Sequence, residues 1–236
     1  MDFKIQSDTQ KKFLADATKR YKLSLDGSPA EEYLARRYLL TPENQVALSR
    51  FQIGYVDDPL PGHEWYKGWL AIPYLRWAPG RNDEEMRGWS VATMKFRCLE
   101  QHEGTCEEAH PRLGKYMAHG GANTHIFNTL DIQNTDDEIA ICEGELDAIT
   151  AHLCGIPAIG VPGVQNWKDH YFRLLKGYKK IWMFADGDSY GEGLAKKIAD
   201  RMGDKVSVIK MPDKEDVNSM VGKYGKQALL KGMGRE

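Results

Sequence analysis

The fold is decided by two short stretches of the chain, Ile139-Ala-Ile-Cys-Glu-Gly-Glu-Leu-Asp147 and Lys180-Ile-Trp-Met-Phe-Ala-Asp-Gly-Asp188. In each stretch a short apolar run is followed at once by acidic residues and a glycine. An apolar run bounded by turn residues is typical of a buried strand. The two stretches therefore predict two buried strands that both end in carboxylates.

Strand-like and helix-like segments alternate through the second half of the chain. The predicted strands are 139–142, 158–161, 180–185 and 206–209, and the predicted helices are 146–154, 167–175 and 194–202. This alternation predicts βα units and a parallel sheet, with right-handed crossovers that place helices on both faces. The expected fold class is therefore α/β.

Acidic residues follow three of these four strands, where the carboxyl ends of a parallel sheet bind ligands. Glu143 follows the first strand, and Asp186 and Asp188 follow the third. Clustered carboxylates repel one another unless a cation compensates, and oxygen ligands of this kind suit Mg²⁺ or Mn²⁺. The alternative is that each acid alone is an ordinary turn or cap residue.

The motifs I-C-E-G-E-L-D and F-A-D-G-D-S-Y-G resemble those of the TOPRIM domain, which is shared by primases, topoisomerases and some nucleases. The resemblance covers about residues 138–220. It implies that Glu143, Asp186 and Asp188 bind the catalytic metal and that Asp147 is a further catalytic acid. The run Lys214-Glu-Asp-Val-Asn218 resembles a primase motif, which makes Asp216 an expected metal ligand and Asn218 a candidate at its rim.

The first half of the chain has a mixed pattern. Helices are expected over 9–21 and 29–39 and from Thr41, and strands over 69–72, 89–94 and 95–99, which together form a smaller α+β subdomain. The polar run Asp131-Ile-Gln-Asn-Thr-Asp-Asp137 is interpreted as a linker or an exposed turn, which sets the domain boundary. The expected domains are therefore 1–137 and 138–236.

Several short segments of this first half resemble the catalytic core of DnaG-type primases. They include Tyr33-Leu-Ala-Arg-Arg37, Phe51-Gln-Ile-Gly-Tyr55, Met94-Lys-Phe-Arg-Cys-Leu99 and Gly114-Lys-Tyr-Met-Ala118. The resemblance implies that Arg97 and Lys115 line a groove for template and nucleotide. Lys95, Arg97 and Lys115 form a basic stripe, and Tyr116 adds an aromatic ring that can stack on bases. Without the resemblance, an ordinary solvated β-ribbon explains the same residues.

Taken together, the two resemblances imply a Mg²⁺-dependent DNA primase core that makes short RNA primers from nucleoside triphosphates on single-stranded DNA. The alternatives are a TOPRIM nuclease with the same metal cluster and a non-catalytic single-strand-binding module of a replisome. A topoisomerase is disfavoured, because the chain has little room for a strand-passage domain. The expected partners are a replicative helicase or a separate zinc-module protein, since no zinc-ribbon pattern precedes the core.

Composition limits the remaining possibilities. The 236 residues carry a net charge of −2, so any nucleic-acid affinity comes from a local groove and not from bulk charge. No apolar run approaches the roughly 20 residues of a membrane span, no signal-peptide pattern opens the chain, and four cysteines are too few for a disulfide scaffold. A cytoplasmic protein, bacterial or in a phage-infected host, is therefore expected.

A Cys/His series recurs at every fourth residue: Cys98, His102, Cys106 and His110. These are the side chains that structural Zn²⁺ sites use. The spacing is not that of a standard zinc finger, and Gly104 argues against one continuous helix. Coincidence in an exposed loop is the alternative, and zinc, if bound, would pin the loop between Arg97 and Lys115.

Overall fold

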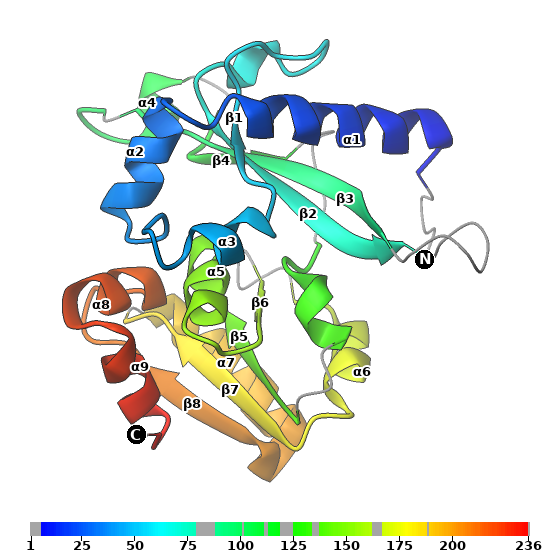
Figure 1. Cartoon of the computed structure of the whole chain (residues 1–236). Helices are drawn as coiled ribbons and strands as arrows, with labels where there is room; N and C mark the ends of the chain where they lie inside the picture. Colours follow the sequence, from blue (N-terminus) through cyan, green and yellow to red (C-terminus); the bar gives the residue numbers. More distant parts are fainter. Residues whose placement is uncertain are drawn as a thin grey trace. The chain divides into compact units, whose positions relative to one another are not determined.

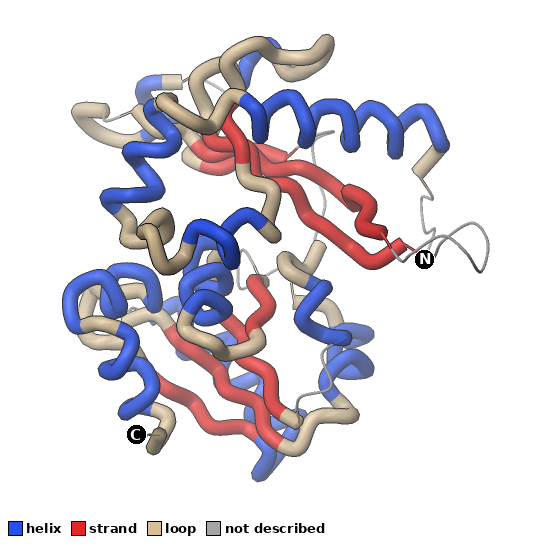
Figure 2. Tube along the Cα trace, viewed as in Figure 1, coloured by secondary structure: helices blue, strands red, loops and turns tan. Residues whose placement is uncertain are grey.

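The computed structural model describes residues 6–78, 88–100, 102–110, 113–118, 125–133, 137–161, 167–187 and 189–235. The chain forms two compact units (Figures 1 and 2). The first unit contains residues 1–36 and 49–125, and the second contains residues 37–48 and 126–236. The units therefore divide after His125, and residues 37–48 belong to the second unit.

The first unit is built on an antiparallel sheet with the order β1-β2-β3-β4. Its strands are β1 (Gly54–Tyr55), β2 (Leu70–Ala78), β3 (Gly88–Arg97) and β4 (Tyr116–Ala118). Its helices are α1 (Asp8–Leu23), α2 (Pro29–Arg36), the 3₁₀ turn η1 (Glu64–Tyr66) and α4 (Cys106–Ala109).

Helix α1 begins in a capping box at Ser7 and packs its apolar stripe on the sheet. The ring of Tyr21 lies 6.4 Å from that of Phe96 on β3, between ring centroids. Because side chains alternate along a strand, Lys95 and Arg97 lie on the opposite face of the sheet from Phe96. The sheet thus presents its basic residues away from α1.

The second unit contains a parallel sheet with the order β6-β5-β7-β8. The strands are β5 (Glu138–Cys142), β6 (Ala158–Gly160), β7 (Lys180–Ala185) and β8 (Val206–Lys210). The other elements of this unit are α3 (Gln45–Ser49, at its edge), η3 (Thr129–Gln133), α5 (Glu145–Leu153), η5 (Asp169–Tyr171), α6 (Phe172–Leu175), α7 (Ser189–Met202), η6 (Gly203–Lys205), α8 (Val217–Tyr224) and α9 (Lys226–Gly232).

The expected α/β class, with helices on both faces of a parallel sheet, is confirmed (Figure 1). The strands over 89–94 and 95–99 are instead a single strand, β3, because its ladder with β2 continues past Met94. The helix predicted over 167–175 is reduced to η5 and α6. Among the described residues, no helix combines the length and apolar character needed to cross a bilayer.

The interpretation of 131–137 as a linker or an exposed turn is wrong at its first residue. Asp131 has no exposed surface and accepts hydrogen bonds at Oδ2 from the side-chain amide of Asn128 and the backbone N–H of Ala158. Its Oδ2 also lies 2.8 Å from Nδ1 of His152. A buried carboxylate needs such polar partners, and two of these lie far away in the sequence.

Candidate active site

The candidate site lies at the carboxyl ends of β5 and β7, the two central strands of the parallel sheet. After β5 the chain crosses to β6 on one side, and it then returns to β7 on the other side. The crevice at such a reversal of strand order is where open α/β sheets bind ligands. Two of the predicted metal ligands, Glu143 and Asp186, directly follow these two strands.

Glu143 and Asp186 are joined by a hydrogen bond. The backbone N–H of Asp186 donates to Oε1 of Glu143 over 3.0 Å. Both residues are partly exposed. The structure therefore brings these two predicted ligands together, whereas Asp188 lies outside the described residues.

The turn after β7 is packed tightly against the turn after β8. The N–H of Gly187 donates to the carbonyl of Glu215, and a Cβ atom at Gly187 would lie 2.0 Å from the carbonyl oxygen of Pro212. Only glycine permits this approach of two backbones. Gly187 thus fixes the start of the D-G-D turn relative to the loop that carries Asp216.

Asp147 lies in the first turn of α5 and is 6% exposed. Its Oδ1 accepts a hydrogen bond from the backbone N–H of Asn218, and its Oδ2 would lie 2.5 Å from a Cβ atom at Gly144. Burial raises the pKa of Asp147 to about 7, and the carboxylate of Asp216 adds to the rise. The glycine of the E-G-x-x-D motif therefore makes room for its second acid.

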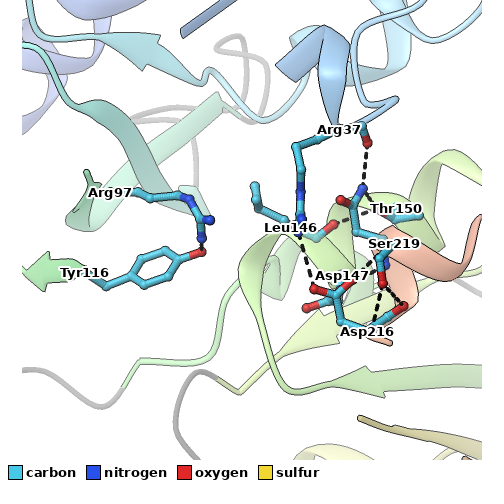
Figure 3. Close-up of polar contacts among 9 residues, drawn as sticks. Arg37, Arg97, Tyr116, Leu146, Asp147, Thr150, Asp216 and Ser219 are labelled. Atoms are coloured by element: carbon cyan, nitrogen blue, oxygen red, sulfur yellow. Dashed lines mark hydrogen bonds and ion pairs between the residues drawn. The ribbon is translucent and has the colours of Figure 1, made fainter. Parts of the chain in front are cut away.

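Asp216 caps α8 in a capping box with Ser219 (Figure 3). Its Oδ1 accepts from the N–H of Ser219, and its Oδ2 accepts from Nη2 of Arg37 over 3.3 Å. Burial raises the pKa of Asp216, but the Ser219 N–H and the Arg37 guanidinium outweigh it and leave the pKa lowered. Both oxygens of Asp216 thus have partners in the protein, and its role as a metal ligand stays a prediction.

Asn218 is 2% exposed and connects three segments of the second unit. Its side-chain amide donates to the carbonyl of Arg37 over 2.8 Å and to Oγ1 of Thr150 over 2.9 Å. Arg37 therefore contacts this loop through both its guanidinium and its carbonyl. Sequence reasoning missed this role of Arg37, because no local pattern relates residues so distant in the chain.

The predicted template residues lie in the first unit. The guanidinium of Arg97, which is 8% exposed, lies over the rings of Tyr33 and Tyr116, and Arg97 donates a hydrogen bond to the hydroxyl of Tyr116 (Figure 3). Lys95 lies over the ring of Tyr74, and Lys115 is exposed. Arg97 and Tyr116 are cross-strand partners on β3 and β4, so this part of the predicted stripe is brought together.

The Cys/His series of the first unit is also brought together. Donor atoms of Cys98, His102 and Cys106 lie within 4.8 Å of one another, and so do those of Glu100, His102 and His110. These groups could hold a metal ion.

Comparison with known proteins gives relatives along most of the chain. Residues 140–221 match the family model described as Toprim-like. The Gene 57 protein of Mycobacterium phage D29 is 44% identical over 165 residues, which are 70% of this chain and 97% of that protein. A DNA primase of Clostridium acetobutylicum is 32% identical over 116 residues, 47% of this chain but only 19% of that enzyme.

Solved structures agree on the fold. The RNA polymerase domain of Mycobacterium tuberculosis primase DnaG, solved with double-stranded DNA, superimposes with a TM-score of 0.70 at 18% identity, covering 97% of this chain and 81% of that chain. A DnaG primase catalytic domain bound to single-stranded DNA gives a TM-score of 0.65 at 18% identity, covering 95% and 80%.

Proposed function

The chain belongs to the family of the mycobacteriophage Gene 57 protein and has the fold of the DnaG-type primase catalytic core, with a Toprim-like domain, and on this basis we propose that it is a DNA primase core. Its reaction is the template-directed synthesis of short RNA primers from nucleoside triphosphates on single-stranded DNA. The observation that carries the proposal is the juxtaposition of Glu143 and Asp186 at the central strand ends.

The residues present at these strand ends fit a divalent cation. Carboxylate oxygens are the ligands that Mg²⁺ and Mn²⁺ favour, and Glu143 and Asp186 supply them from two adjacent turns. Asp188 and Asp216 complete the proposed ligand set. When bound, the metal neutralises the charge that develops as a 3′-hydroxyl attacks an α-phosphate and pyrophosphate leaves.

The protein's own contribution is to hold these carboxylates in place before substrate binds. The Asp186 N–H fixes one oxygen of Glu143, and the Gly187 contact with Pro212 fixes the turn after β7. Asp147 supports the site from α5 through its bond to Asn218. Such preorganisation counts because phosphoryl-type transfer depends on positioning and electrostatics.

Template and nucleotide would be bound by the basic face of the first unit. Lys95, Arg97 and Lys115 are the cations for phosphate groups, and Tyr116 presents an aromatic ring. The DNA-bound structures of the DnaG fold support a DNA ligand. We further propose that the protein works in the cytoplasm of a bacterial or phage-infected cell, with a helicase or a zinc-module protein as partner.

The experiment is a primer-synthesis assay with single-stranded DNA, labelled ribonucleotides and Mg²⁺ or Mn²⁺. We compare the unaltered protein with Asp186→Asn, which removes one proposed ligand, and with Asp204→Asn. Asp204 is an exposed carboxylate that precedes β8, at the opposite edge of the sheet, so it controls for the loss of charge. Short labelled products from the unaltered protein and from Asp204→Asn, but not from Asp186→Asn, are expected.

Other outcomes overturn the proposal in distinct ways. Metal-dependent loss of the DNA without synthesis would indicate a nuclease that uses the same carboxylates. Binding of single strands with neither activity would indicate a replisome module. Full synthesis by Asp186→Asn would show that this carboxylate is not part of the reaction.

A further inference from the structure

The segment between β3 and β4 forms a loop whose base is closed by the sheet. The backbone N–H of Cys98 donates to the carbonyl of Lys115 over 3.0 Å, immediately beyond the last residue of β3. Within the loop, Gly104 has φ +103° and turns the chain, and Thr105 then caps the four-residue helix α4. The chain therefore bends between His102 and Cys106.

This bend and the short helix bring the Cys/His series into two groups that share His102, one with Cys98 and Cys106 and the other with Glu100 and His110. Cys106 is the first residue of α4, and His110 follows its last residue as the C-cap, with φ −123° and ψ 85°. Cys98 faces them from the end of β3. The regular spacing of four residues is thus not that of one helix. Cys98 follows β3, a bend at Gly104 separates His102 from Cys106, and α4 separates Cys106 from His110.

The distances from Cys98 to the two histidines are those expected between ligands of a tetrahedral zinc ion. Sγ of Cys98 lies 3.3 Å from Nε2 of His102 and 3.7 Å from Nε2 of His110. With Zn–S bonds of about 2.3 Å and Zn–N bonds of about 2.0 Å, tetrahedral geometry separates sulfur and nitrogen by about 3.5 Å. The sulfur of Cys106 lies within 4.8 Å of the Cys98 and His102 donor atoms.

The burial pattern indicates what holds this loop together. Among the described residues from Glu100 to His110, only His102, Cys106 and His110 are partly buried, and the others are exposed. α4 buries none of its residues, and a single helical turn has no stability of its own. Among the described residues, this stretch therefore has no apolar core, and its most buried side chains are the candidate ligands.

We propose that Cys98, His102, Cys106 and His110 bind a structural Zn²⁺ ion. Two thiolates and two imidazoles are a complete and closed ligand set for zinc, with no position left for a substrate. Glu100 lies beside both histidines, because its Oε2 is 3.9 Å from Nδ1 of His102 and 3.5 Å from Nε2 of His110.

The site would stabilise the end of the sheet that carries the basic face. Cys98 follows Arg97 directly. Its backbone N–H donates to the carbonyl of Lys115, which extends the pairing of Arg97 with Tyr116 by one residue. A metal at Cys98 thus ties the end of β3 to the start of β4 through α4. Its role is structural, and it involves none of the carboxylates proposed for catalysis.

The test measures metal on the full chain, independently of primer synthesis. The reduced protein is stripped with a chelator, loaded with Zn²⁺ or Co²⁺, desalted, and examined by elemental analysis and visible absorption. We expect one zinc per chain, and a Co²⁺ spectrum with thiolate charge-transfer and tetrahedral bands. The double variant Cys98→Ser/Cys106→Ser loses both, whereas Cys154→Ala, which removes a buried thiol of the second unit, retains them.

A second readout does not depend on how well the variants fold. Glu103, Glu107 and Glu108 are exposed, so a glutamate-specific protease reports on the order of the loop. Cleavage after these residues in the unaltered protein is expected to be faster without zinc than with it. Retention of zinc by the double variant, a cobalt spectrum without thiolate bands, or a Cys98–Cys106 disulfide in the purified protein would each overturn the proposal.

Discussion

The backbone N–H of Asn218 donates a hydrogen bond to the carboxylate of Asp147, which joins the first turn of α8 to the first turn of α5. The side chain of the same asparagine bonds to Arg37 and Thr150. These contacts hold the loop after β8 beside the acids after β5. Loss of these contacts should therefore lower the free energy of unfolding.

Replacement of Asn218 by alanine is expected to destabilise the protein by about 1–3 kcal/mol, because it leaves the Arg37 carbonyl without its amide donor inside the protein. Urea unfolding measures the change. Gln227→Ala is the control, since Gln227 is exposed on α9. Equal stability of Asn218→Ala and the control would contradict the role given to Asn218.

The raised pKa of Asp147 predicts a pH-dependent stability. Between pH 3.8 and about pH 7 the folded state binds a proton at Asp147 that the unfolded chain releases, so the free energy of unfolding falls as the pH rises. Asp147→Asn removes this fall, since its amide oxygen still accepts from Asn218. The lowered pKa of Asp216 has the opposite effect: below pH 3.8 it makes the free energy of unfolding rise as the pH rises.

Unfolding in urea at a series of pH values, with a chelator present, gives the comparison for Asp147. The stability of Asp147→Asn relative to the unaltered protein should increase across this window and level off above about pH 7. A difference that is the same at every pH would mean that Asp147 is ionised in the folded protein throughout.

Gly187→Ala is expected to cost about 1–3 kcal/mol of stability, because its Cβ atom forces apart the turns after β7 and β8. Primer synthesis should fall by more than the loss of folded protein explains, because the displaced turn carries Asp186. Gly193→Ala is the matched control: apart from its chain neighbours and the backbone of α7, no atom lies within 4 Å of its Cβ position, and alanine favours the helix by about 0.5–1 kcal/mol. Full activity of Gly187→Ala would rule out the packing argument.

Lys115→Ala should weaken the binding of single-stranded DNA and reduce its salt dependence. Removal of one phosphate contact lowers the slope of log K against log salt by about 0.7 for a single strand. Fluorescence anisotropy at several salt concentrations measures this slope. Lys12→Ala on α1 is the control, and an equal effect of both substitutions would assign the binding to general charge.

Arg97→Lys keeps the charge but is expected to impair the basic face. The guanidinium lies over two tyrosine rings and bonds to the Tyr116 hydroxyl, and a lysine ammonium does not reproduce that planar arrangement. The same anisotropy titration should show weaker binding with an unchanged slope. Tight binding by Arg97→Lys would mean that only the charge of this residue counts.

The parallel sheet and the position of its acids were predictable from the sequence because they depend on local patterns. An apolar run followed by acidic and glycine residues predicts both a strand and the turn at its carboxyl end, as at Glu143 and Asp186. The strands 139–142 and 180–185 are confirmed almost residue for residue.

The contacts that join distant segments were not predictable. Arg37 meets Asn218 across 181 positions of sequence, and neither residue differs locally from a solvated polar side chain. Asp131 was misinterpreted for the same reason, since its partner at Ala158 is supplied by the edge strand β6. Polar residues have an environment-dependent role, whereas apolar periodicity reports the core directly.

The assignment of residues 37–48 to the second unit has a consequence for synthesis on the ribosome. This segment is translated well before the groups on α8 that Arg37 and Tyr38 contact, since Asn218 lies 181 positions after Arg37. Until α8 has been synthesised, residues 37–48 lack the groups against which they pack in the folded second unit. The second unit therefore completes its packing only once α8 has been synthesised, and a fragment beginning at Ile126 would lack part of that packing.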